Sequence, residues 1–282
     1  MRIAAVTTVY YPDEDFLLKN YLQVNKYLYK YIIVNNSPDY QFLKIKDDDN
    51  IIIITSENSG VSGGANTGIK YANSLSCNYV IFFDQDSLCD VDMLSQMISS
   101  LKLFDNNCII APNVLNYSNI GVHDKYFSKG TRINQRYIEI PTTQLSGMMV
   151  PLYLFDNIGL FDENYFLNFV DTEWCWRAIA NNYKIIIDTD AKLYHAFGEG
   201  KKKLIFYNFY INAPFRMYYA SRDSLFLITE AHIKLFVKAK VLIKLLVTFI
   251  EIFVQDYKMK RYYYLFKGIL DFICGVRGNG LR

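Results

Sequence analysis

The stretch from Ile81 to Ser87 reads I-F-F-D-Q-D-S, and it places two carboxylates directly behind an apolar run that begins at Asn78. This run predicts a buried β-strand over Val80–Phe83. Successive strand side chains point to opposite faces, so Asp84 and Asp86 share a face and repel each other. A positively charged partner is therefore expected at this strand end.

Five further apolar segments have the length and composition of buried strands. Large apolar residues with helical spacing over Phe16–Tyr29 separate the first two of them. Strands that alternate with helices predict an α/β protein with a mostly parallel, doubly wound sheet, whose ligand crevice lies beyond the carboxyl ends of the strands. The five predicted strands are Arg2–Thr8, Tyr31–Val34, Ile51–Ile54, Cys108–Ala111 and Lys184–Ile187.

A glycine-rich segment, Glu57–Gly68, leads into a predicted helix over Ile69–Ser74. Glycines let the backbone approach a phosphate closely, and a helix N-terminus attracts anions, so this segment could hold a diphosphate. It matches neither the Walker pattern nor GxGxxG, and a plain turn with a helix cap explains it equally well.

A later segment, Val170–Ala178, has the marks of a helix start. Asp171 is at the position expected for an N-cap, and Glu173 and Arg177 form an i,i+4 pair in the favourable orientation. The helix is expected to end near Asn181. Other predicted elements are a variable loop or hairpin over Asn116–Arg136 and a short helix over Phe155–Phe161 that ends at Gly159.

The charge of the chain is unevenly distributed. Its 282 residues suffice for one large domain or for a domain with an appendage, and the net charge is +2. Residues 1–200 contain 15 basic and 23 acidic side chains, whereas residues 201–282 contain 15 and 5. We therefore divide the chain into an α/β domain over 1–200 and a basic, helical region over 201–282.

Cysteine spacing and the N-terminus indicate the compartment. The five cysteines are scattered and lack CxxC spacing, so the pattern predicts neither a disulfide framework nor a zinc site, and a reducing compartment is expected. The first residues lack the apolar region and cleavage site of a secretory signal, so cytosolic synthesis is expected. No uncharged apolar run approaches the roughly 20 residues that cross a bilayer.

Motifs in a fixed order along most of the chain resemble family 2 of the glycosyltransferases. These are inverting enzymes with a GT-A fold, and the similar branch is the bacterial one that includes rhamnosyltransferases of O-antigen and capsule synthesis. The matching segments are Thr8–Pro12, Val34–Ser37, Asn58–Gly68, Asp84–Asp86, Ser146–Gly147, Asp171–Arg177, His195–Gly198 and Arg216–Asp223.

The resemblance implies roles for the acidic residues and the histidine. Asp84 and Asp86 would hold Mg²⁺ or Mn²⁺ against the donor diphosphate, with Asp86 favoured as the direct ligand. His195 would complete the metal shell or contact the diphosphate, the alternative being a strand-end histidine bonded to backbone. Asp171 would be the general base that accepts the proton of the acceptor hydroxyl, the alternative being a simple N-cap.

The resemblance also implies a donor site and an acceptor site. Glu173 and Arg177 are interpreted mainly as structural support for their helix. Trp176 could equally belong to the core. Asn35 and Asn36 are both amides where the family often has a carboxylate, so the selectivity for thymine or uracil is less secure. The implied donor residues are Thr8, Tyr10, Asn36, Asn58, Gly63, Gly64, Asn66 and Asp84, and the implied acceptor or sugar residues are Trp174, Gly147 and Glu173.

The basic C-terminal region suits a lipid surface. In Ile233–Val254 the charged residues fall on one side of a helix, and Lys201–Lys203 and Tyr257–Tyr264 add cations and aromatic rings. We predict peripheral attachment to the cytoplasmic face of the inner membrane, where a polyprenyl-diphosphate-linked acceptor would be presented. The alternative is that this apolar face packs on the GT-A domain or in a homodimer. Nucleic acid is excluded as a partner, since no nucleic-acid-binding motif is present.

The sequence thus predicts an inverting, metal-dependent glycosyltransferase that moves L-rhamnose from dTDP-L-rhamnose to a lipid-linked oligosaccharide of bacterial O-antigen or capsule. Galactofuranosyl or other hexosyl transfer from a UDP-sugar is one alternative. A catalytically silent sugar-nucleotide-binding subunit is another, disfavoured by the intact acidic set. A nucleotidyltransferase would be expected to have a basic glycine-rich loop after its first strand, where this chain has Tyr10–Asp13.

Overall fold

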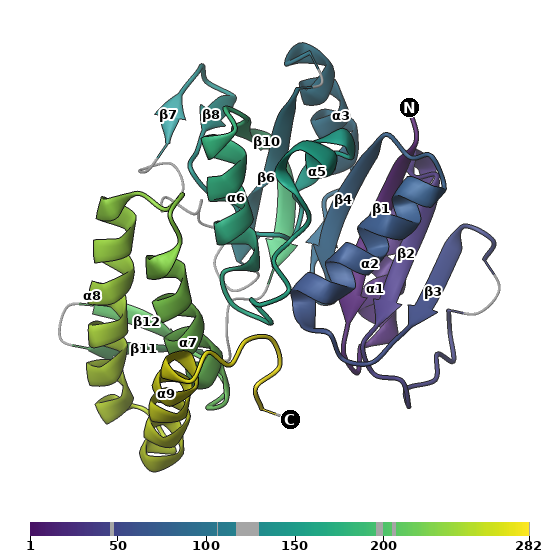
Figure 1. Cartoon of the computed structure of the whole chain (residues 1–282). Helices are drawn as coiled ribbons and strands as arrows, with labels where there is room; N and C mark the ends of the chain where they lie inside the picture. Colours follow the sequence, from purple (N-terminus) through teal and green to yellow (C-terminus); the bar gives the residue numbers. More distant parts are fainter. Residues whose placement is uncertain (46–47, 106, 117–129, 196–199, 205–206, 282) are drawn as a thin grey trace.

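A computed structural model describes residues 1–45, 48–105, 107–116, 130–195, 200–204 and 207–281 (Figure 1). Its centre is a ten-stranded mixed sheet in the order β3-β2-β1-β4-β9-β6-β10-β8-β7, with β5 beside β10. A separate hairpin pairs β11 (Gly200–Leu204) with β12 (Tyr207–Ile211). The strands of the central sheet are β1 (Ile3–Val9), β2 (Lys30–Asn35), β3 (Ile51–Thr55), β4 (Tyr79–Asp84), β5 (Leu88–Cys89), β6 (Cys108–Asn116), β7 (Thr131–Arg132), β8 (Tyr137–Glu139), β9 (Met149–Pro151) and β10 (Lys184–His195).

Strands β3, β2, β1 and β4 are parallel neighbours, so their carboxyl ends meet at one edge of the sheet. Thr8 of β1 is in register with Val34 of β2 and with Asp84 of β4. This register places the ends of the three strands at one level. The four predicted strands of this half are confirmed to within one residue at each end.

The other half of the sheet departs from the prediction. The short strand β9 runs antiparallel between β4 and β6, and the sequence analysis did not predict it. Strand β10 continues to His195, well beyond the predicted end at Ile187. A register shift between Asp188 and Lys192 interrupts its pairing with β6, and the polar residues there break the apolar pattern.

Helices cover both faces of the sheet, as the alternation of strand side chains requires. One hydrophobic core joins Ile32 and Val34 to α2 (Gly60–Ser74), α5 (Tyr153–Ile158) and α6 (Val170–Ala180). The other core joins Tyr31 and Ile33 to α1 (Glu14–Val24) and α3 (Met93–Leu103). The helix predicted over 16–29 ends at Val24 in the structure, and the 3₁₀ turn η1 (Asn25–Tyr27) follows it. The doubly wound α/β class is confirmed.

The glycine-rich segment is helical from Gly60, so the predicted loop up to Gly68 is wrong. A Cβ atom on Gly64 would lie 2.3 Å from Cγ2 of Thr8, and one on Gly68 would lie 2.2 Å from Cγ1 of Val6. These glycines therefore let α2 pack closely on β1, which offsets their poor helix propensity.

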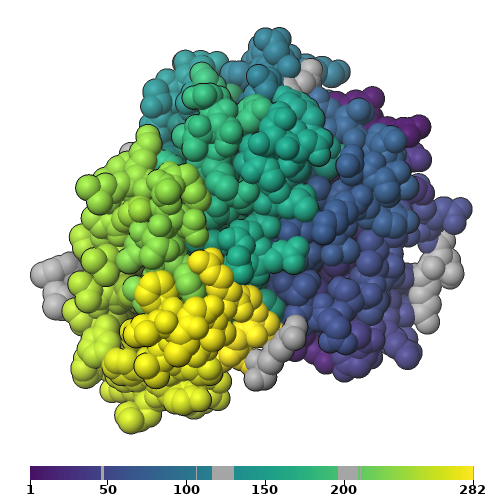
Figure 2. All heavy atoms as spheres, in the orientation of Figure 1, coloured from purple at the N-terminus to yellow at the C-terminus, as the bar shows by residue number. Residues whose placement is uncertain are grey.

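Three C-terminal helices, α7 (Arg216–Thr229), α8 (Leu235–Glu251) and α9 (Lys258–Ile273), stand beside the α/β part, and the 3₁₀ turn η2 (Ile252–Val254) follows α8 (Figure 1). α7 packs against both α8 and α9. The tail returns to the α/β part, since Gly278 N–H donates to the carbonyl of Asn164 at 3.0 Å. Figure 2 shows the yellow C-terminal segment lying against the teal part of the molecule. Among the described residues, every helix falls short of the length and hydrophobicity needed to cross a membrane. The boundary near residue 200 stays a prediction.

Candidate functional site

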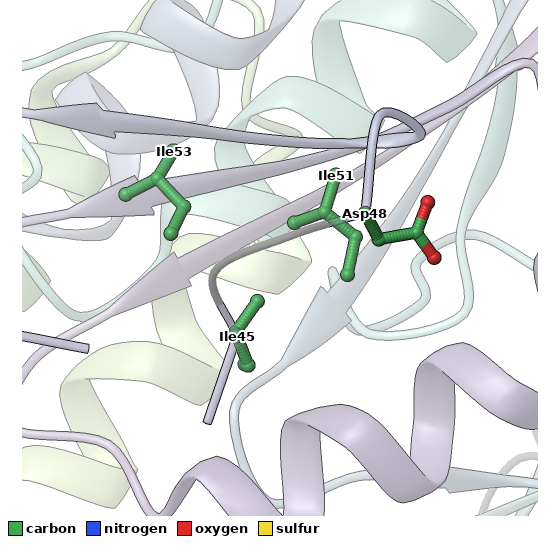
Figure 3. A pocket seen from close by; sticks show the side chains of 4 residues that line it. All are labelled: Ile45, Asp48, Ile51 and Ile53. Atoms are coloured by element: carbon green, nitrogen blue, oxygen red, sulfur yellow. The ribbon is translucent and has the colours of Figure 1, made fainter. Parts of the chain in front are cut away.

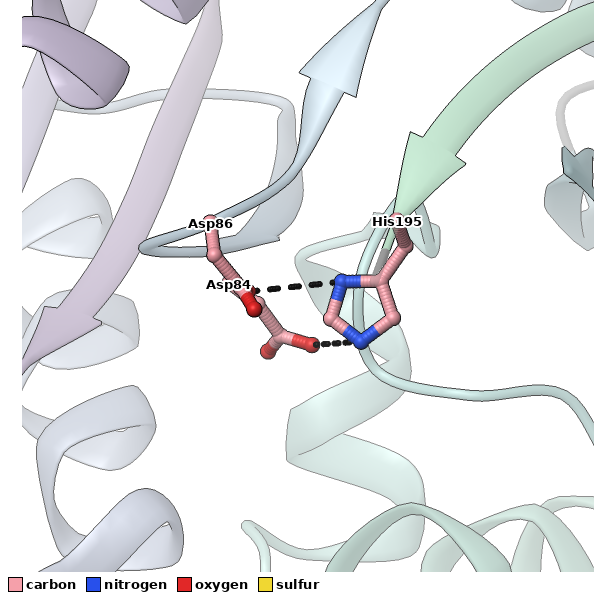
Figure 4. Close-up of side chains that lie close together, drawn as sticks. All are labelled: Asp84, Asp86 and His195. Atoms are coloured by element: carbon pink, nitrogen blue, oxygen red, sulfur yellow. Dashed lines mark ion pairs between the residues drawn. The ribbon is translucent and has the colours of Figure 1, made fainter. Parts of the chain in front are cut away.

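Two aspartates and one histidine meet at the carboxyl ends of β4 and β10 (Figure 4). Nε2 of His195 lies 3.7 Å from Oδ2 of Asp84, and Nδ1 lies 3.4 Å from Oδ1 of Asp86. The two strands are not neighbours in the sheet, but β5 follows Asp86 directly and pairs with the end of β10. His195 is therefore the partner that the repelling carboxylates required.

Two serines hold this cluster in place. Oγ of Ser87 is 3.0 Å from Nδ1 of His195 and 2.8 Å from Oγ of Ser146, which accepts the backbone N–H of Asp84 at 3.1 Å. His195 thus contacts side chains of both the aspartate and the serine pair. The sequence analysis did not identify Ser87. Gly198, part of the same predicted motif, lies outside the described residues.

Burial and mutual charge set the electrostatics of the cluster. The pKa of Asp84 is raised to about 6, mainly by burial. The charges of Asp86 and Asp171 also raise it, whereas the charges of His195 and Arg216 act to lower it. Burial also acts to raise the pKa of Asp86, but its hydrogen bond and charge interaction with His195 outweigh burial and lower it. For His195, burial acts to lower the pKa, and the two aspartates outweigh it and raise it. The cluster therefore carries more negative charge than one imidazole offsets.

The cluster fits a divalent cation. One ligand atom from each of Asp84, Asp86 and His195 lies within 4.8 Å of the other two. Carboxylate oxygens suit Mg²⁺ and Mn²⁺, and neutral imidazole is a competent ligand. The side chains of Asp84 and Asp86 are 40% and 49% exposed, so oxygens of a bound molecule can reach the same point.

Asp171 lies in the first turn of α6 and is held by three hydrogen bonds. Oδ2 accepts the N–H of Leu145 at 3.2 Å, and Oδ1 accepts the N–H and the hydroxyl of Thr172 at 2.6 and 3.1 Å. The N-cap position belongs to Phe169, whose φ is 62°, so the alternative of Asp171 as N-cap is wrong. Burial raises the pKa of Asp171 despite these bonds, which makes its carboxylate a stronger base.

Residues predicted to line the nucleoside pocket lie at or just beyond the carboxyl ends of β1, β2 and β3. Tyr10 is 54% exposed, and its backbone N–H donates to Oε1 of Gln85 at 2.8 Å. Gln85 stands between the two aspartates and was not identified by the sequence analysis, although its position alone could have indicated a link between β1 and β4. Oδ1 of Asn58 accepts the N–H of Gly60 at 3.1 Å. Tyr10 and Asn58 stay predictions.

Four other donor residues instead maintain the fold. Asn36 is 3% exposed, and its Nδ2 donates to the carbonyl of Gly60 at 2.8 Å. Asn66 is 2% exposed and bonds to both the carbonyl and the N–H of Phe161 at 2.9 and 3.0 Å. Thr8 lies against Gly64, as described above. These contacts give Asn36, Gly64 and Asn66 structural roles, and their contact with the donor stays a prediction.

Gly63 has a packing role of the same kind. A Cβ atom there would lie 2.5 Å from the Cβ of Ser59, which directly precedes α2. Because Gly63 has no side chain, Ser59 at the start of the same helix can lie against it. At Gly63 the glycine therefore has a structural role at the helix start, in line with the alternative of a plain turn with a helix cap.

Trp174 and Gly147 do not line a surface. Trp174 is fully buried, packs against Phe161 with ring centroids 5.5 Å apart, and donates from Nε1 to the carbonyl of Gly159 at 2.9 Å. Gly147 has a φ of 83°, and a Cβ there would lie 2.3 Å from Cγ of Pro112. The prediction that they form an acceptor or sugar wall is corrected, since both belong to the core.

Glu173 is 3% exposed and supports its helix, as its alternative interpretation stated. Nε of Arg177 lies 2.6 Å from its Oε1, and Nε2 of His232 lies 3.1 Å from the same atom. Arg177 also donates to the carbonyl of Leu160 at 2.8 Å. The carboxylate of Glu173 is therefore paired within the protein, and the prediction that it contacts an acceptor directly is corrected. Trp176 is also core.

A cavity of about 200 Å³ lies elsewhere, at the edge strand β3 (Figure 3). Strands β2 and β1 separate it from β4, so it is not part of the cluster. Its lining residues are Ile45, Asp48, Ile51 and Ile53.

Comparison with known proteins gives consistent results. The model of glycosyl transferase family 2 matches residues 6–153. The chain is 28% identical to dTDP-rhamnosyl transferase RfbF of Shigella flexneri, over 98% of this chain and 96% of that protein. It is 25% identical to the low-salt glycan biosynthesis hexosyltransferase Agl10 of Haloferax volcanii, over 64% of this chain and 63% of that protein.

Solved structures share the fold. S. aureus TarS superposes with a TM-score of 0.61 at 15% identity, over 98% of this chain and 49% of that one. GalNAc-T7, solved with UDP, GalNAc and Mn²⁺, superposes with a TM-score of 0.58 at 11% identity, over 73% of this chain and 45% of that one. A shorter TarS chain in complex with UDP gives 0.56 at 15% identity, over 86% and 70%. The GT-A-like fold predicted from the motifs is confirmed.

Proposed function

The chain belongs to glycosyl transferase family 2 and is a glycosyltransferase, and on this premise we propose that it transfers L-rhamnose from dTDP-L-rhamnose to a lipid-linked oligosaccharide. The observation that carries the reaction type is the meeting of Asp84, Asp86 and His195. Asp171 is linked to this cluster through the consecutive residues Leu145 and Ser146. The similarity to a dTDP-rhamnosyl transferase over nearly the whole of both chains supports the donor. Synthesis of bacterial O-antigen or capsule is the process this reaction would serve.

Asp84, Asp86 and His195 would hold Mg²⁺ or Mn²⁺ against the diphosphate of the donor. The presence of Mn²⁺ in the GalNAc-T7 complex, which has the same fold, supports this proposal. When bound, the cation supplies Lewis-acid assistance to the departing nucleoside diphosphate. The Arg216 side chain, whose charge acts on all three residues, adds positive charge at the same place.

Asp171 would be the general base. The acceptor hydroxyl oxygen attacks the anomeric carbon from the face opposite the diphosphate, and its proton passes to a carboxylate oxygen of Asp171. The bond from the anomeric carbon to the diphosphate oxygen breaks, and dTDP leaves with the electron pair. A single displacement inverts the anomeric configuration. The N–H groups of Leu145 and Thr172 keep the carboxylate oriented for this role.

Transfer of another hexose from a UDP-sugar, galactofuranose included, is the second candidate. The similarity to a hexosyltransferase and the UDP complex of TarS favour it. Asn35 and Asn36 are amides in a buried position, where neither presents the carboxylate that the family often uses at the base. A silent subunit is disfavoured because Asp84, Asp86 and His195 lie together and Asp171 is also present.

Incubating the purified protein with Mn²⁺, lipid-linked acceptors from a bacterial membrane extract and each of dTDP-L-rhamnose, UDP-galactofuranose and UDP-glucose decides between the two donors. Mass spectrometry of the extracted lipids is expected to show a deoxyhexose increment with dTDP-L-rhamnose alone. A hexose increment from a UDP-sugar would transfer the assignment to the second candidate. Product in none of the reactions would favour the silent subunit.

The C-terminal helices would attach the enzyme to the cytoplasmic face of the inner membrane. One side of α8 and α9 packs inward, where Ile252 and Leu265 are buried against Met217. The opposite side, which we call the outer helical face, leaves large apolar side chains exposed in an area that monomers rarely leave uncovered. Its residues are Leu235, Phe236, Leu242, Ile243, Leu246, Phe249, Ile250, Phe253, Met259, Tyr263, Phe266, Leu270 and Ile273.

Charge favours a lipid surface as the partner of the outer helical face. Exposed lysines flank it at Lys234, Lys240 and Lys258, within a region of 15 basic and 5 acidic residues. Anionic headgroups attract such cations, and the apolar side chains can enter the interface. A homodimer through this face is the alternative. Packing on the α/β part, the other alternative for this apolar region, accounts only for the inner side of the helices.

A further inference from the structure

A cavity of about 320 Å³ lies between the start of α6 and the C-terminal helices. Asn168, Phe169 and Thr172 line it from the α6 side. Ala220 of α7 and Thr248 of α8 line it from the opposite side. The cavity is therefore built jointly by the α/β part and the helical C-terminal region.

The cavity adjoins the proposed general base. Its lining residues bracket Asp171 in the sequence, and one of them, Thr172, donates from its hydroxyl to Oδ1 of Asp171 at 3.1 Å. On the other side, Oδ2 of Asp171 accepts the N–H of Leu145 at 3.2 Å, and the hydroxyl of the next residue, Ser146, accepts the N–H of Asp84 in the cation cluster at 3.1 Å. Asp171 thus connects the cluster, which would hold the donor diphosphate, to a separate space that a second substrate can occupy.

The lining is amphiphilic. Phe169, Met217 and Leu245 present apolar groups, whereas Asn168 and Thr248 bring an amide and a hydroxyl. Such a mixture suits a saccharide, whose C–H faces pack on apolar side chains and whose hydroxyls need hydrogen-bond partners. The hydroxyl of Thr248 donates to the carbonyl of Lys244 at 2.9 Å, and its oxygen can still accept a hydrogen bond from a saccharide hydroxyl. The volume lies at the lower end of the range for small-molecule sites, which suits a short saccharide.

We propose that this cavity binds the acceptor saccharide, with the reacting hydroxyl directed at Asp171. The proposal rests on the proposed function, because it takes Asp171 as the base and the cluster as the donor side. It also assigns a task to the C-terminal helices in addition to membrane attachment. Their inner sides complete the acceptor site, while the outer helical face meets the lipid from which the acceptor extends.

Two variants fill the cavity from opposite walls, Ala220→Trp on α7 and Thr248→Trp on α8. The matched control is Ala239→Trp, at an exposed position of α8 that does not line the cavity. The probes are the octyl glycosides of rhamnose, galactose, glucose and N-acetylglucosamine. Saturation-transfer NMR on the full chain reports contact with the protein separately for the sugar protons and for the octyl protons.

At least one glycoside is expected to receive saturation on its sugar protons from the wild type and from Ala239→Trp. Each cavity-filling variant that keeps the wild-type circular dichroism spectrum should weaken this binding at least tenfold, with the melting shift by Mn²⁺ and dTDP unchanged. If one variant unfolds, the other decides. Sugar binding that survives filling, or saturation of the octyl protons alone, overturns the proposal. Loss of sugar binding on filling, combined with no response to any nucleotide, supports the cavity and overturns the donor assignment instead.

Discussion

At the scale of single residues, a substitution of Asp171 should affect the chemical step of transfer without affecting donor binding. Asp171→Asn keeps the shape of the side chain but removes its capacity to accept a proton, so transfer is expected to fall by at least a hundredfold. The affinity for dTDP should change little, because the cation cluster is untouched. Initial rates of transfer and calorimetric titration with dTDP measure the two effects.

The control for this variant is Asp156→Asn, an exposed carboxylate on α5. It is expected to leave both the rate and the affinity at wild-type values. Wild-type turnover in Asp171→Asn would contradict its role as the base.

The pH dependence of turnover follows from the same residue. Burial raises the pKa of Asp171, opposed by its bonds to Thr172 and Leu145. Only the deprotonated carboxylate accepts a proton, so turnover is present above this raised pKa and is lost as pH falls through it. Profiles of kcat recorded with saturating Mn²⁺ and donor should therefore show an acidic limb at higher pH than an ordinary aspartate gives. A limb at or below the ordinary value, with melting temperature constant across the range, would contradict the assignment.

Single residues also show what the sequence can and cannot predict. Asp84, Asp86 and His195 were predicted together, because carboxylates at a strand end suit a divalent cation and the family resemblance adds His195 to its shell. Trp174 and Asn66 belong to the same motifs, but they are buried and bonded within the protein. A motif lists residues that the fold needs and residues that the substrate needs, and spacing alone does not distinguish the two.

At the scale of elements, α2 was predicted least well. Its glycines were interpreted as a loop, either one that holds a diphosphate or a plain turn with a helix cap, because their helix propensity is low and only the facing strand explains them. Strand β9 was missed because three residues carry too little alternation to be recognised. The far half of β10 was missed because it follows a register shift among polar residues. Each error arises where tertiary contacts outweigh the local pattern.

The packing role of α2 predicts a stability effect. Gly64→Ala places a methyl group within 2.3 Å of Cγ2 of Thr8, so the helix must move away from β1. Overpacking of this kind costs about 1–3 kcal/mol in the free energy of unfolding. Asn73→Ala, at an exposed site of the same helix, should change stability little. Urea denaturation measures both, and an equally stable Gly64→Ala would show that the glycine is not needed for packing.

At the scale of the whole molecule, membrane attachment and catalysis meet in the C-terminal helices. Deleting α8 and α9 would uncover Met217, against which Ile252 and Leu265 are buried, as well as remove the outer helical face, so truncation cannot separate the two roles. The double variant Leu246→Glu with Phe253→Glu changes only exposed positions, 62% and 57% accessible in the folded protein. It is therefore the sharper test.

Co-sedimentation with phosphatidylglycerol vesicles is expected to capture the wild type, less so at high salt, and to fall at least tenfold for this double variant. The matched control, Leu43→Glu with Leu103→Glu, alters leucines that are 74% and 62% exposed in the α/β part, and should bind like the wild type. A wild-type dimer in solution that this double variant makes monomeric, without vesicle binding, would favour the homodimer instead.

The measurement that tests the central claim most directly is the thermal stability of the purified wild type and of Asp86→Ala with Mn²⁺ and dTDP-L-rhamnose, each with and without EDTA. A ligand that binds the native state raises the melting temperature by mass action. The account predicts a rise for the wild type that EDTA abolishes and that Asp86→Ala lacks. The same rise in the presence of EDTA, or an undiminished rise in Asp86→Ala, would contradict a cation site at Asp84, Asp86 and His195.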